Sequence, residues 1–556
     1  MGTIAAMKSP IVSCVIALTF SLSALNAVYA GSATWNVNPA TNDWNTATNW
    51  TPVTIPNGPD DTATFGNTSV PNVVIHSDVE VNGVVFTDQA VSYTITDGDA
   101  STENVVNFTI SGLGIVNNAP FPQFQIIEAA PTLVTNGTRN TIRLKNNAAL
   151  AEVAPISTGL NAEGGSGLGS VGGQVRFLDN SSLGSGFAQA LNSLNGGSGG
   201  EIWFLDNSSA SNKSGPSNGQ LSALGAGTGS AQGQIFFMGT STGSNASIGA
   251  EGGKVFFMES SNAGDLAVSA YGGGNVIFSD TASAGSVALT ADGLGPGGTI
   301  QFLGDSTGGT AQAGLSYPGN DTLDISGHNP PGVTIGSLVG LGSIVNLGAN
   351  TLTVGSDNLT TSYGGSIEGS GSVIKIGTGT LTLNGSNTYT GATTVNSGVL
   401  YVTNRAGSGT GTGFVNVRTG TLAGNGIIAG GVTIGRRASL EPNNNGTGIL
   451  TIQGALSLLR ASALSWKIDL SHLNVGRVLA NGVTISTGSR FNVIATGNGT
   501  LTIGTSFVVI SNTSANPIAG TFSNLPNGGI VNANGNNLQA NYEGGGGNDL
   551  TLTVVP

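Results

Sequence analysis

One short pattern recurs six times between residues 172 and 309 and limits how this chain can fold. Each copy reads Gly-Gly-x-Val/Ile-x-Phe or a close variant. The shared phenylalanines lie 20 to 33 residues apart, at Phe177, Phe204, Phe237, Phe257, Phe278 and Phe302. Residues i and i+2 of a strand face the same side, so each copy predicts a strand that points one β-branched residue and one Phe inward. The preceding glycines suit a turn where φ is positive or a side chain would clash.

A strong strand repeated every 20–30 residues is typical of a solenoid. Leucine-rich repeats need a Leu/Asn spacing that this chain lacks, helical repeats need a 3.6-residue periodicity, and propeller blades need about 40 residues per unit. We therefore predict an all-β, right-handed parallel β-helix with an N-terminal β region and a C-terminal cap. At about 22 residues and about 4.8 Å per coil, the rod would be on the order of 100 Å long.

The composition agrees with this fold and excludes several functional classes. Glycine accounts for 90 of 556 residues, and only 8% of the residues are charged. Lys and Arg number 16 against 29 Asp and Glu, whereas a nucleic-acid binder needs clustered cations. Coiled-coil heptads and the three-residue glycine period of collagen are missing. A hydrophobic content of 38% is too high for a disordered chain.

The first 30 residues have the pattern of a secretory signal peptide. Lys8 precedes an apolar run from Ile11 to Leu25, and small residues ending at Ala30 predict cleavage after that residue. Cleavage would remove Cys14, the only cysteine, so the mature chain would have no disulfide and no thiolate. No later stretch has the 18 consecutive apolar residues of a transmembrane helix.

A second series of strands follows the first. In this series Leu352, Leu381, Leu400 and Leu422 lie 19 to 29 residues apart. Between the two series, Pro318, Pro330 and Pro331 indicate a loop-rich junction. The predicted organisation begins with a signal peptide (1–30), an N-terminal β region with first coils (31–150) and the Gly-Gly-x-Val-x-Phe coils (151–310). The junction (311–345), the second repeats (346–475) and a capping segment (476–556) follow.

The second series resembles a known family. Residues 371–402 read GSVIKIGTGTLTLNGSNTYTGATTVNSGVLYV. This string resembles the autotransporter-associated β-strand repeat, whose signature is GTLTLxGxNTYTGxTTVNxGxLxV. Residues 419–453 continue in the family's manner, except that Arg436, Arg437 and Glu441 replace commoner neutral residues.

Both ends of the chain resemble the same family. Residues 33–66, with Trp35, Trp44 and Trp50, resemble its opening segment, and the stretch from Gly520 onward resembles its closing segment. The resemblance implies a passenger-type β-helix that a Gram-negative bacterium exports and then displays or releases. Such proteins often end in an outer-membrane barrel. This sequence lacks the barrel pattern, so export by a separate barrel and a sorting tail beyond residue 556 are both open expectations.

Two G-x-S-x-G matches and three histidines are candidates for catalysis. Ser241 and Ser306 occupy the matches, but a nucleophile elbow needs a following helix and a His partner. Neither match is followed by a helical pattern, so we predict that both serines are turn residues. His76, His328 and His472 are far apart and lack metal-ligand spacing, which predicts solvent or loop positions.

Two further patterns each have a functional and a structural interpretation. Residues 544–552, GGGGNDLTL, resemble one nonapeptide of a calcium-binding β-roll, but only one copy is present and Thr551 stands where a large apolar residue belongs. We therefore favour a Gly-rich hairpin. Carboxylates also recur just after the repeat strands, at Asp179, Asp206, Asp280 and Asp305. They could form a row for calcium or acid/base chemistry, although we favour turn residues.

An aromatic residue precedes the repeat Phe in three copies, at Trp203, Phe236 and Phe256. These residues predict either an exposed stripe for glycans or side chains packed under adjoining loops. The sequence thus offers many repeated positions but no convergent catalytic group.

We therefore expect a secreted or surface-displayed structural or adhesive protein with no catalytic residues, metal site or cofactor. Its partners would be glycans, extracellular matrix or other cells, and not nucleic acid. The alternative is a polysaccharide lyase or hydrolase on the same scaffold, because fold does not decide function. That activity needs paired carboxylates or an Asp–Arg cluster in one groove, and Arg436–Arg437 is the only adjacent basic pair.

Overall fold

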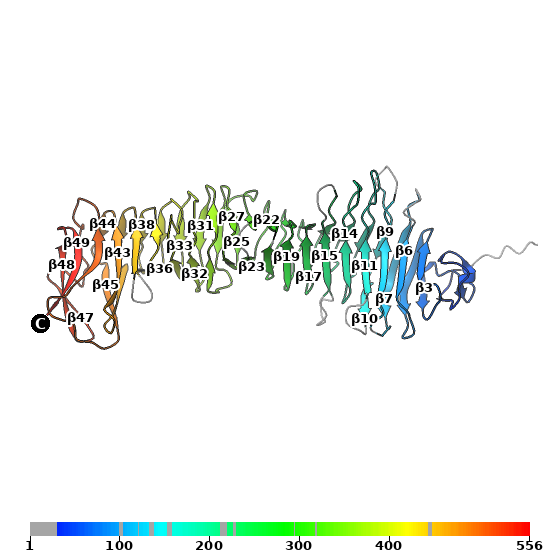
Figure 1. Cartoon of the computed structure of the whole chain (residues 1–556), viewed down its shortest axis with the longest axis horizontal. Coiled ribbons are helices and arrows are strands. Elements are labelled where there is room, and N and C mark those ends of the chain that lie inside the picture. Colours follow the sequence, from blue (N-terminus) through cyan, green and yellow to red (C-terminus); the bar gives the residue numbers. More distant parts are fainter. Residues whose placement is uncertain are drawn as a thin grey trace, which may run out of the picture.

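The chain folds into a long rod of stacked coils, with its two ends at opposite ends of the rod (Figure 1). This computed structural model describes residues 30–98, 104–120, 122–132, 138–152, 158–211, 219–225, 230–293, 295–316, 320–442 and 448–556. The predicted signal peptide lies outside the described residues except for Ala30, so cleavage after that residue stays a prediction. Among the described residues the single helix is a short 3₁₀ turn, Ala47–Asn49.

The first sheet extends from the N-terminal end of the rod to residue 368. Its strands pair in parallel from coil to coil, apart from an antiparallel β1–β2 pair at the end. In spatial order they are β2 (Trp50–Thr51), β1 (Ala33–Trp35), β3 (Gly58–Phe65), β5 (Val79–Phe86), β7 (Asn107–Asn117), β9 (Thr141–Leu144), β12 (Gln174–Phe177), β14 (Glu201–Phe204), β16 (Gln234–Phe237), β18 (Lys254–Phe257), β20 (Asn275–Phe278), β22 (Thr299–Phe302), β24 (Thr322–Asp324), β27 (Ile344–Asn346) and β30 (Ser366–Glu368), with β10 (Leu150–Glu152) also pairing β7.

The second sheet forms another side of the same coils and reaches further along the rod. Its strands also pair in parallel, each with the strand one coil away. They are β4 (Asn72–Ile75), β6 (Tyr93–Asp97), β8 (Gln125–Ala129), β11 (Thr158–Ala162), β13 (Phe187–Ala190), β15 (Gln220–Leu224), β17 (Ser247–Glu251), β19 (Ala267–Tyr271), β21 (Ala288–Asp292), β23 (Gln312–Leu315), β26 (Ser337–Gly340), β29 (Thr361–Tyr363), β32 (Thr380–Leu383), β34 (Val399–Val402), β36 (Gly420–Gly424), β39 (Ala438–Pro442), β42 (Ala463–Asp469) and β45 (Arg490–Thr496).

The third side of the coils changes along the rod. Between Ala149 and Thr307 it is held by single-residue bridges, of which Ser182–Ser209 is one. From residue 332 onward it becomes a parallel sheet of eight strands. These are β25 (Gly332–Ile335), β28 (Thr351–Val354), β31 (Ser372–Lys375), β33 (Thr393–Val395), β35 (Val415–Val417), β38 (Val432–Ile434), β41 (Leu456–Leu458) and β44 (Val483–Ile485).

A C-terminal sheet closes the rod. Parallel strands β37 (Ile427–Ile428), β40 (Gly448–Ile452), β43 (Asn474–Ala480) and β46 (Ser506–Asn512) are followed by the antiparallel strands β49 (Asp549–Val555), β48 (Asn536–Gly544) and β47 (Ile530–Ala533). The change to antiparallel pairing ends the coil-to-coil ladder. These three antiparallel strands lie within residues 476–556, for which the sequence predicts a capping segment. At the other end, Trp35, Trp44 and Trp50 are buried together with Phe65.

The core of the rod is built from the ladders that the repeats predict. The six repeat phenylalanines are buried and stack with ring centroids 4.4 to 4.9 Å apart and nearly parallel planes. The Val or Ile two residues before each Phe is also buried. The chain is thus an all-β parallel β-helix, which confirms the predicted fold class. Its right-handed sense stays a prediction.

The stretch 311–345 differs from the expected loop-rich junction. It contains strands β23 to β26 and the start of β27, and all three sides of the coil continue through it. Pro330 and Pro331 lie in the turn between β24 and β25, where their missing N–H groups leave the ladders intact. Pro318 lies outside the described residues. Prolines therefore marked one turn within the solenoid and not a boundary between two parts of it.

Candidate functional site

The outward aromatic residues of the first sheet form a continuous row. Trp203, Phe236 and Phe256 are in register on β14, β16 and β18. Their ring centroids lie 4.0 and 4.9 Å apart, with interplanar angles of 18° and 5°. Phe236 is therefore covered on both faces, and Trp203 and Phe256 are each covered on one, whereas a sugar that stacks on an aromatic ring needs a free face. The row favours packing along the rod over the glycan stripe.

The carboxylates that follow the repeat strands hold the corners of the coils. Asp179, Asp206 and Asp280 all have φ near +55°, and Glu259 occupies the same corner with φ of 56°. Each carboxylate accepts a hydrogen bond from a backbone N–H on the preceding coil, for example Asp280 Oδ2 from Glu259 N at 3.0 Å. Asp305 lies one residue beyond this row, because Gly304 occupies the corner. This arrangement supports the turn role over an open carboxylate row.

The two serines of the G-x-S-x-G matches face the interior. Ser241 and Ser306 are 0% and 2% exposed, and each N–H closes a turn onto a carbonyl three residues earlier. They share their position in the coil with the buried serines Ser181, Ser208 and Ser261. A nucleophile must reach solvent and a base, whereas these two hydroxyl groups are buried and have no hydrogen-bond partner among the residues that the structure describes.

The three histidines lie on separate coils. His76 Nδ1 is 3.0 Å from Asp43 Oδ1, and His472 Nδ1 is 2.7 Å from Asp469 Oδ2. The His76 side chain is half exposed, and the His472 side chain is largely exposed. His328 contacts two backbone carbonyl oxygens. Because the rings are far apart along the rod, they form no common site.

The Gly-rich segment near the C-terminus is the turn of the β48–β49 hairpin. Asp549 Oδ1 accepts a hydrogen bond from Asn512 N at 2.8 Å, and Thr551 is buried between strands. In the part of the chain that the structure describes, no group of three His, Cys, Asp or Glu side chains is placed to hold a metal ion. The geometry is that of the hairpin which the sequence favours.

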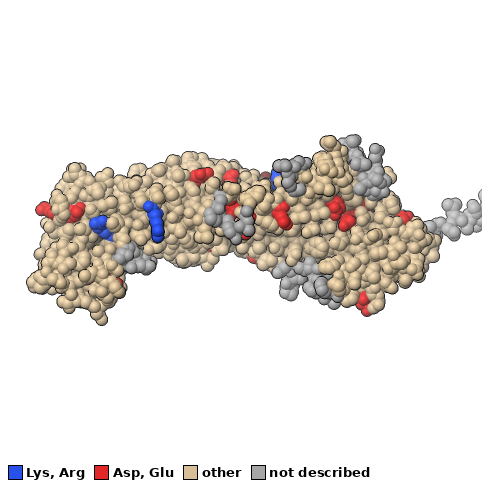
Figure 2. Space-filling view, in the orientation of Figure 1, with Lys and Arg blue, Asp and Glu red and all other residues tan. Residues whose placement is uncertain are grey.

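Charged side chains are sparse and scattered on the face of the rod in Figure 2. Most of this surface is uncharged, so a partner would meet few charged groups there. Against this background, the hollows that gather polar side chains are the candidate sites.

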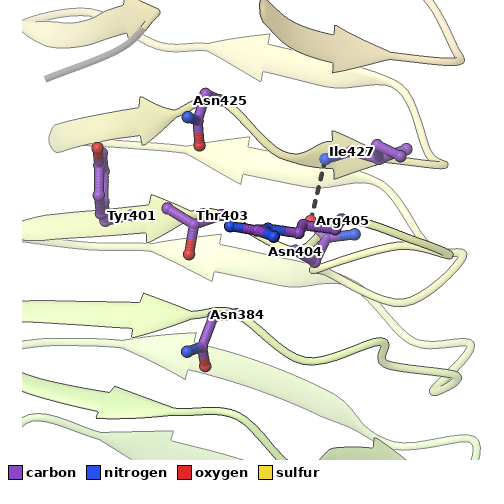
Figure 3. Close-up of a pocket in the computed structure, with 7 residues that line it drawn as sticks. All are labelled: Asn384, Tyr401, Thr403, Asn404, Arg405, Asn425 and Ile427. Atoms are coloured by element: carbon purple, nitrogen blue, oxygen red, sulfur yellow. Dashed lines mark hydrogen bonds between the residues drawn. The ribbon is translucent and has the colours of Figure 1, made fainter. Parts of the chain in front are cut away.

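A hollow of about 660 Å³ opens on the second sheet, on coils in the second half of the chain (Figure 3). It is lined by Asn384, Tyr401, Thr403, Asn404, Arg405, Asn425 and Ile427. Figure 3 shows Asn384, Thr403 and Asn425 on successive coils, each just after a strand of the second sheet. Asn404 is buried, and its Oδ1 accepts a hydrogen bond from Ile427 N at 3.0 Å. This bond fixes one wall of the hollow between two coils.

Tyr401 differs from the stacked aromatic row in its neighbours. On β34 it is in register with Thr382 on one coil and Ala423 on the next. Both neighbours are small, so no ring in its own row covers either face of Tyr401. Arg405 is exposed and lines the same hollow. The hollow thus combines one aromatic ring, amide groups and a cation, which are the groups that a sugar ring and its hydroxyls can contact.

A second hollow, of about 450 Å³, lies near the N-terminal end. Its lining includes Glu128 and Glu163. Burial raises the pKa of Glu128, and burial together with the charge of Glu128 raises the pKa of Glu163 to about 7. A carboxyl group that titrates near neutral pH can both donate and accept a proton.

Neither hollow was identified from the sequence alone. Glu128 and Glu163 lie before the clear repeats, where coil lengths are irregular. Tyr401 had a usable signal, because in the string Val-Leu-Tyr-Val it alternates with the inward Leu400 and Val402 and must face outward.

Comparison with known proteins yields one family match. Residues 373–402 match the passenger-associated-transport-repeat. No curated protein matches the chain. The described part of the chain has no helix with the length and hydropathy needed to cross a membrane. The matched segment covers most of β31 and all of β32, β33 and β34, and it includes Asn384 and Tyr401 of the hollow. The resemblance found in the sequence is thereby confirmed over residues 373–402, a repeat consistent with an autotransporter-associated protein of passenger type.

Proposed function

We propose that the chain is a passenger-type scaffold that is secreted or displayed at the surface of a Gram-negative bacterium and that binds glycans without turning them over. The repeat at residues 373–402 supports the passenger assignment. Continuous ladders of parallel strands support the scaffold role, because they hold successive coils at a fixed spacing. Weak contacts repeated along such a rod add up when the partner is an extended polymer or a cell surface.

The hollow around Tyr401 is the observation that carries the binding role. A sugar can place its C–H face on the open face of the ring, while Asn384 and Asn425 donate to and accept from its hydroxyls. The fixed wall at Asn404 keeps the hollow preformed, which lowers the entropic cost of binding.

The test compares binding of the chain from Gly31 onward to immobilised neutral oligosaccharides. We expect Tyr401→Ala to weaken binding at least tenfold and Tyr401→Phe to retain most of it. Phe236→Ala is the matched control, because that ring is covered on both faces, by Trp203 and by Phe256. Equal binding by Tyr401→Ala and the parent chain, or no binding of any neutral glycan, would refute the glycan-binding role.

Localisation tests the passenger role separately. Intact cells of the native organism are treated with protease, and cells and medium are blotted for residues 31–556. Protease-sensitive protein on cells, or protein in the medium, is the expected result. Protein that is found only inside intact cells would contradict export.

A second candidate function rests on the pocket that holds Glu128 and Glu163. Two carboxyl groups with raised pKa values in one hollow are suited to acid/base hydrolysis of a glycosidic bond. This alternative requires that the chain release reducing ends from a polysaccharide and that Glu163→Gln abolish the release. If the Glu163→Gln variant still cleaves the polysaccharide, Glu163 is not the catalytic residue.

A further inference from the structure

Three arginines gather in one hollow of a chain that is poor in cations. The chain has 16 Lys and Arg against 29 Asp and Glu. A cavity of about 400 Å³ beside the first sheet brings Arg139, Arg143 and Arg176 together with Asn107 and Gln174. This volume is within the range of small-molecule sites, about 300–1,000 Å³.

The register of the coils produces the cluster. Arg143 on β9 and Arg176 on β12 are directly paired and both face outward. Like charges opposite each other on neighbouring strands repel. Arg139 precedes β9 and reaches across two coils, where it donates to the carbonyl oxygens of Gly172 and Gly199 at 2.8 and 3.2 Å.

Only one of the three charges is paired within the described residues. Arg139 forms a 2.7 Å ion pair with Glu201. Arg143 donates to the amide oxygen of Asn107, and Arg176 Nε donates to the amide oxygen of Gln174 at 3.0 Å. Neutral amides position these two guanidinium groups without cancelling their charge.

The electrostatic setting favours an incoming anion. Burial, and then the charge of Arg176, lower the pKa of Arg143, while Asp78 and Asp97 act in the opposite direction from outside the cavity lining. An anion between Arg143 and Arg176 would relieve the repulsion in a partly buried place, where ionic hydrogen bonds are strong.

The groups around the cluster specify what kind of anion fits. The planar guanidinium fork matches a carboxylate through two parallel hydrogen bonds. Thr141 and Gln174 lie in register beside the arginines and support them, because Thr141 Oγ1 donates to Arg139 O at 3.1 Å and Gln174 Nε2 donates to Glu201 Oε2 at 2.6 Å. The Trp203 ring lies under Arg176, with its centroid 6.0 Å from Cζ, and holds that side chain in place.

We propose that this cavity binds the carboxylate of a uronate unit in an acidic polysaccharide, with Arg143 and Arg176 as its direct ligands. The site extends the proposed glycan-binding function to charged glycans, but its geometry is independent of the hollow at Tyr401. The two sites lie far apart along the rod, so each can be removed without the other.

Calorimetric titration with a galacturonate trisaccharide at low salt tests the proposal. We expect measurable binding that Arg143→Gln and Arg176→Gln each weaken at least tenfold and that added salt weakens further. Arg436→Gln is the matched control, because Arg436 is exposed on a distant coil. Equal binding by the control and the cavity variants, or no binding by the parent chain, would overturn the proposal.

Two further readouts separate the site from general effects. Removing one of two repelling charges should keep or raise the melting temperature of the unliganded Arg143→Gln chain, so lost binding with a lowered melting temperature would count against the site. A sulfated oligosaccharide that binds as well as the uronate would overturn the carboxylate assignment. If the chain binds neutral glycans at Tyr401 but does not bind uronate, the uronate site is refuted and the proposed function stands. If it binds neither ligand, the proposed function is refuted as well.

Discussion

The inward serines show how single residues in this solenoid depart from ordinary core chemistry. Most buried hydroxyl groups have a hydrogen-bond partner. The Oγ atoms of Ser208, Ser241, Ser261 and Ser306 have none within the described chain. Ser181 Oγ, at the first position of the same row, donates to Leu144 O at 3.1 Å. The same row of the solenoid therefore contains buried hydroxyl groups with a hydrogen-bond partner and buried hydroxyl groups without one.

Replacing a serine that lacks a partner should not destabilise the rod. We expect Ser241→Ala to leave the free energy of unfolding unchanged or to raise it by up to about 1 kcal/mol, because an unsatisfied buried hydroxyl is removed. Ser181→Ala should lower it by about 1 kcal/mol, because a hydrogen bond is lost. Urea unfolding at equal m values measures both. A destabilisation of the same size in both variants would contradict this account.

Glu163 should make stability depend on pH. Its pKa is about 7 in the folded chain against an ordinary 4.5, so its favourable contribution is complete below pH 4.5 and is lost as the pH rises through 7. Glu163→Gln cannot ionise and should be more stable than the parent above pH 7, by up to about 2 kcal/mol after solvent screening. Melting curves from pH 5 to 8 measure the difference, which should shrink toward pH 5. A pH-independent difference would contradict the raised pKa.

At the scale of one element, the corner two residues after a repeat strand of the first sheet adopts the left-handed conformation, from β9 to β22. Asp280 adopts φ of 54° there, and its Oδ2 accepts a hydrogen bond from Glu259 N. We expect Asp280→Ala to lower the free energy of unfolding by about 1–2 kcal/mol, because both the hydrogen bond and a tolerant side chain are lost. Asp280→Asn retains both and should cost less than about 0.5 kcal/mol. Equal losses in the two variants would exclude the capping role.

The inward and the outward phenylalanine of β18 should contribute differently to the free energy of unfolding. Phe257 is buried and stacks between Phe237 and Phe278, whereas the neighbouring Phe256 faces outward. Phe257→Ala should destabilise by about 3–5 kcal/mol, and hydrogen exchange should accelerate mainly on adjacent coils, since repeats contact only their neighbours. Phe256→Ala should lower the free energy of unfolding by clearly less than Phe257→Ala does. An effect spread evenly along the rod would contradict this picture.

These elements also show where prediction from sequence succeeds. The Phe ladder is predictable because each copy repeats Val/Ile-x-Phe after a glycine pair, so strand, facing and register follow together. The arginine cavity could not be found in the same way, because Arg139 and Glu201 meet across two coils of unequal length. Extending the repeat back to Thr141-Ile-Arg-Leu would have paired Arg143 with Arg176, but a Leu replaces the defining Phe.

At the scale of the whole molecule, an open solenoid exposes the edge of its last coil to other chains. The antiparallel strands β48 and β49 cover β46 and bury Leu538, Leu550 and Leu552. An uncovered parallel edge is a template for pairing. We therefore expect these strands to limit association as well as to stabilise the end of the rod.

Removing the hairpin should convert the rod into an associating chain. We expect a chain that ends at residue 527 to assemble in a concentration-dependent way in size-exclusion chromatography with light scattering, whereas Glu543→Gln in the full chain elutes as the parent. Val508 is half-buried on β46, and Val508→Lys in the shortened chain should suppress assembly, because a charge on an edge strand opposes pairing. If the lysine does not reduce assembly, the shortened chain associates because it has lost its fold and not through the edge of β46. If the shortened chain stays folded and does not associate, the removed strands do not protect that edge.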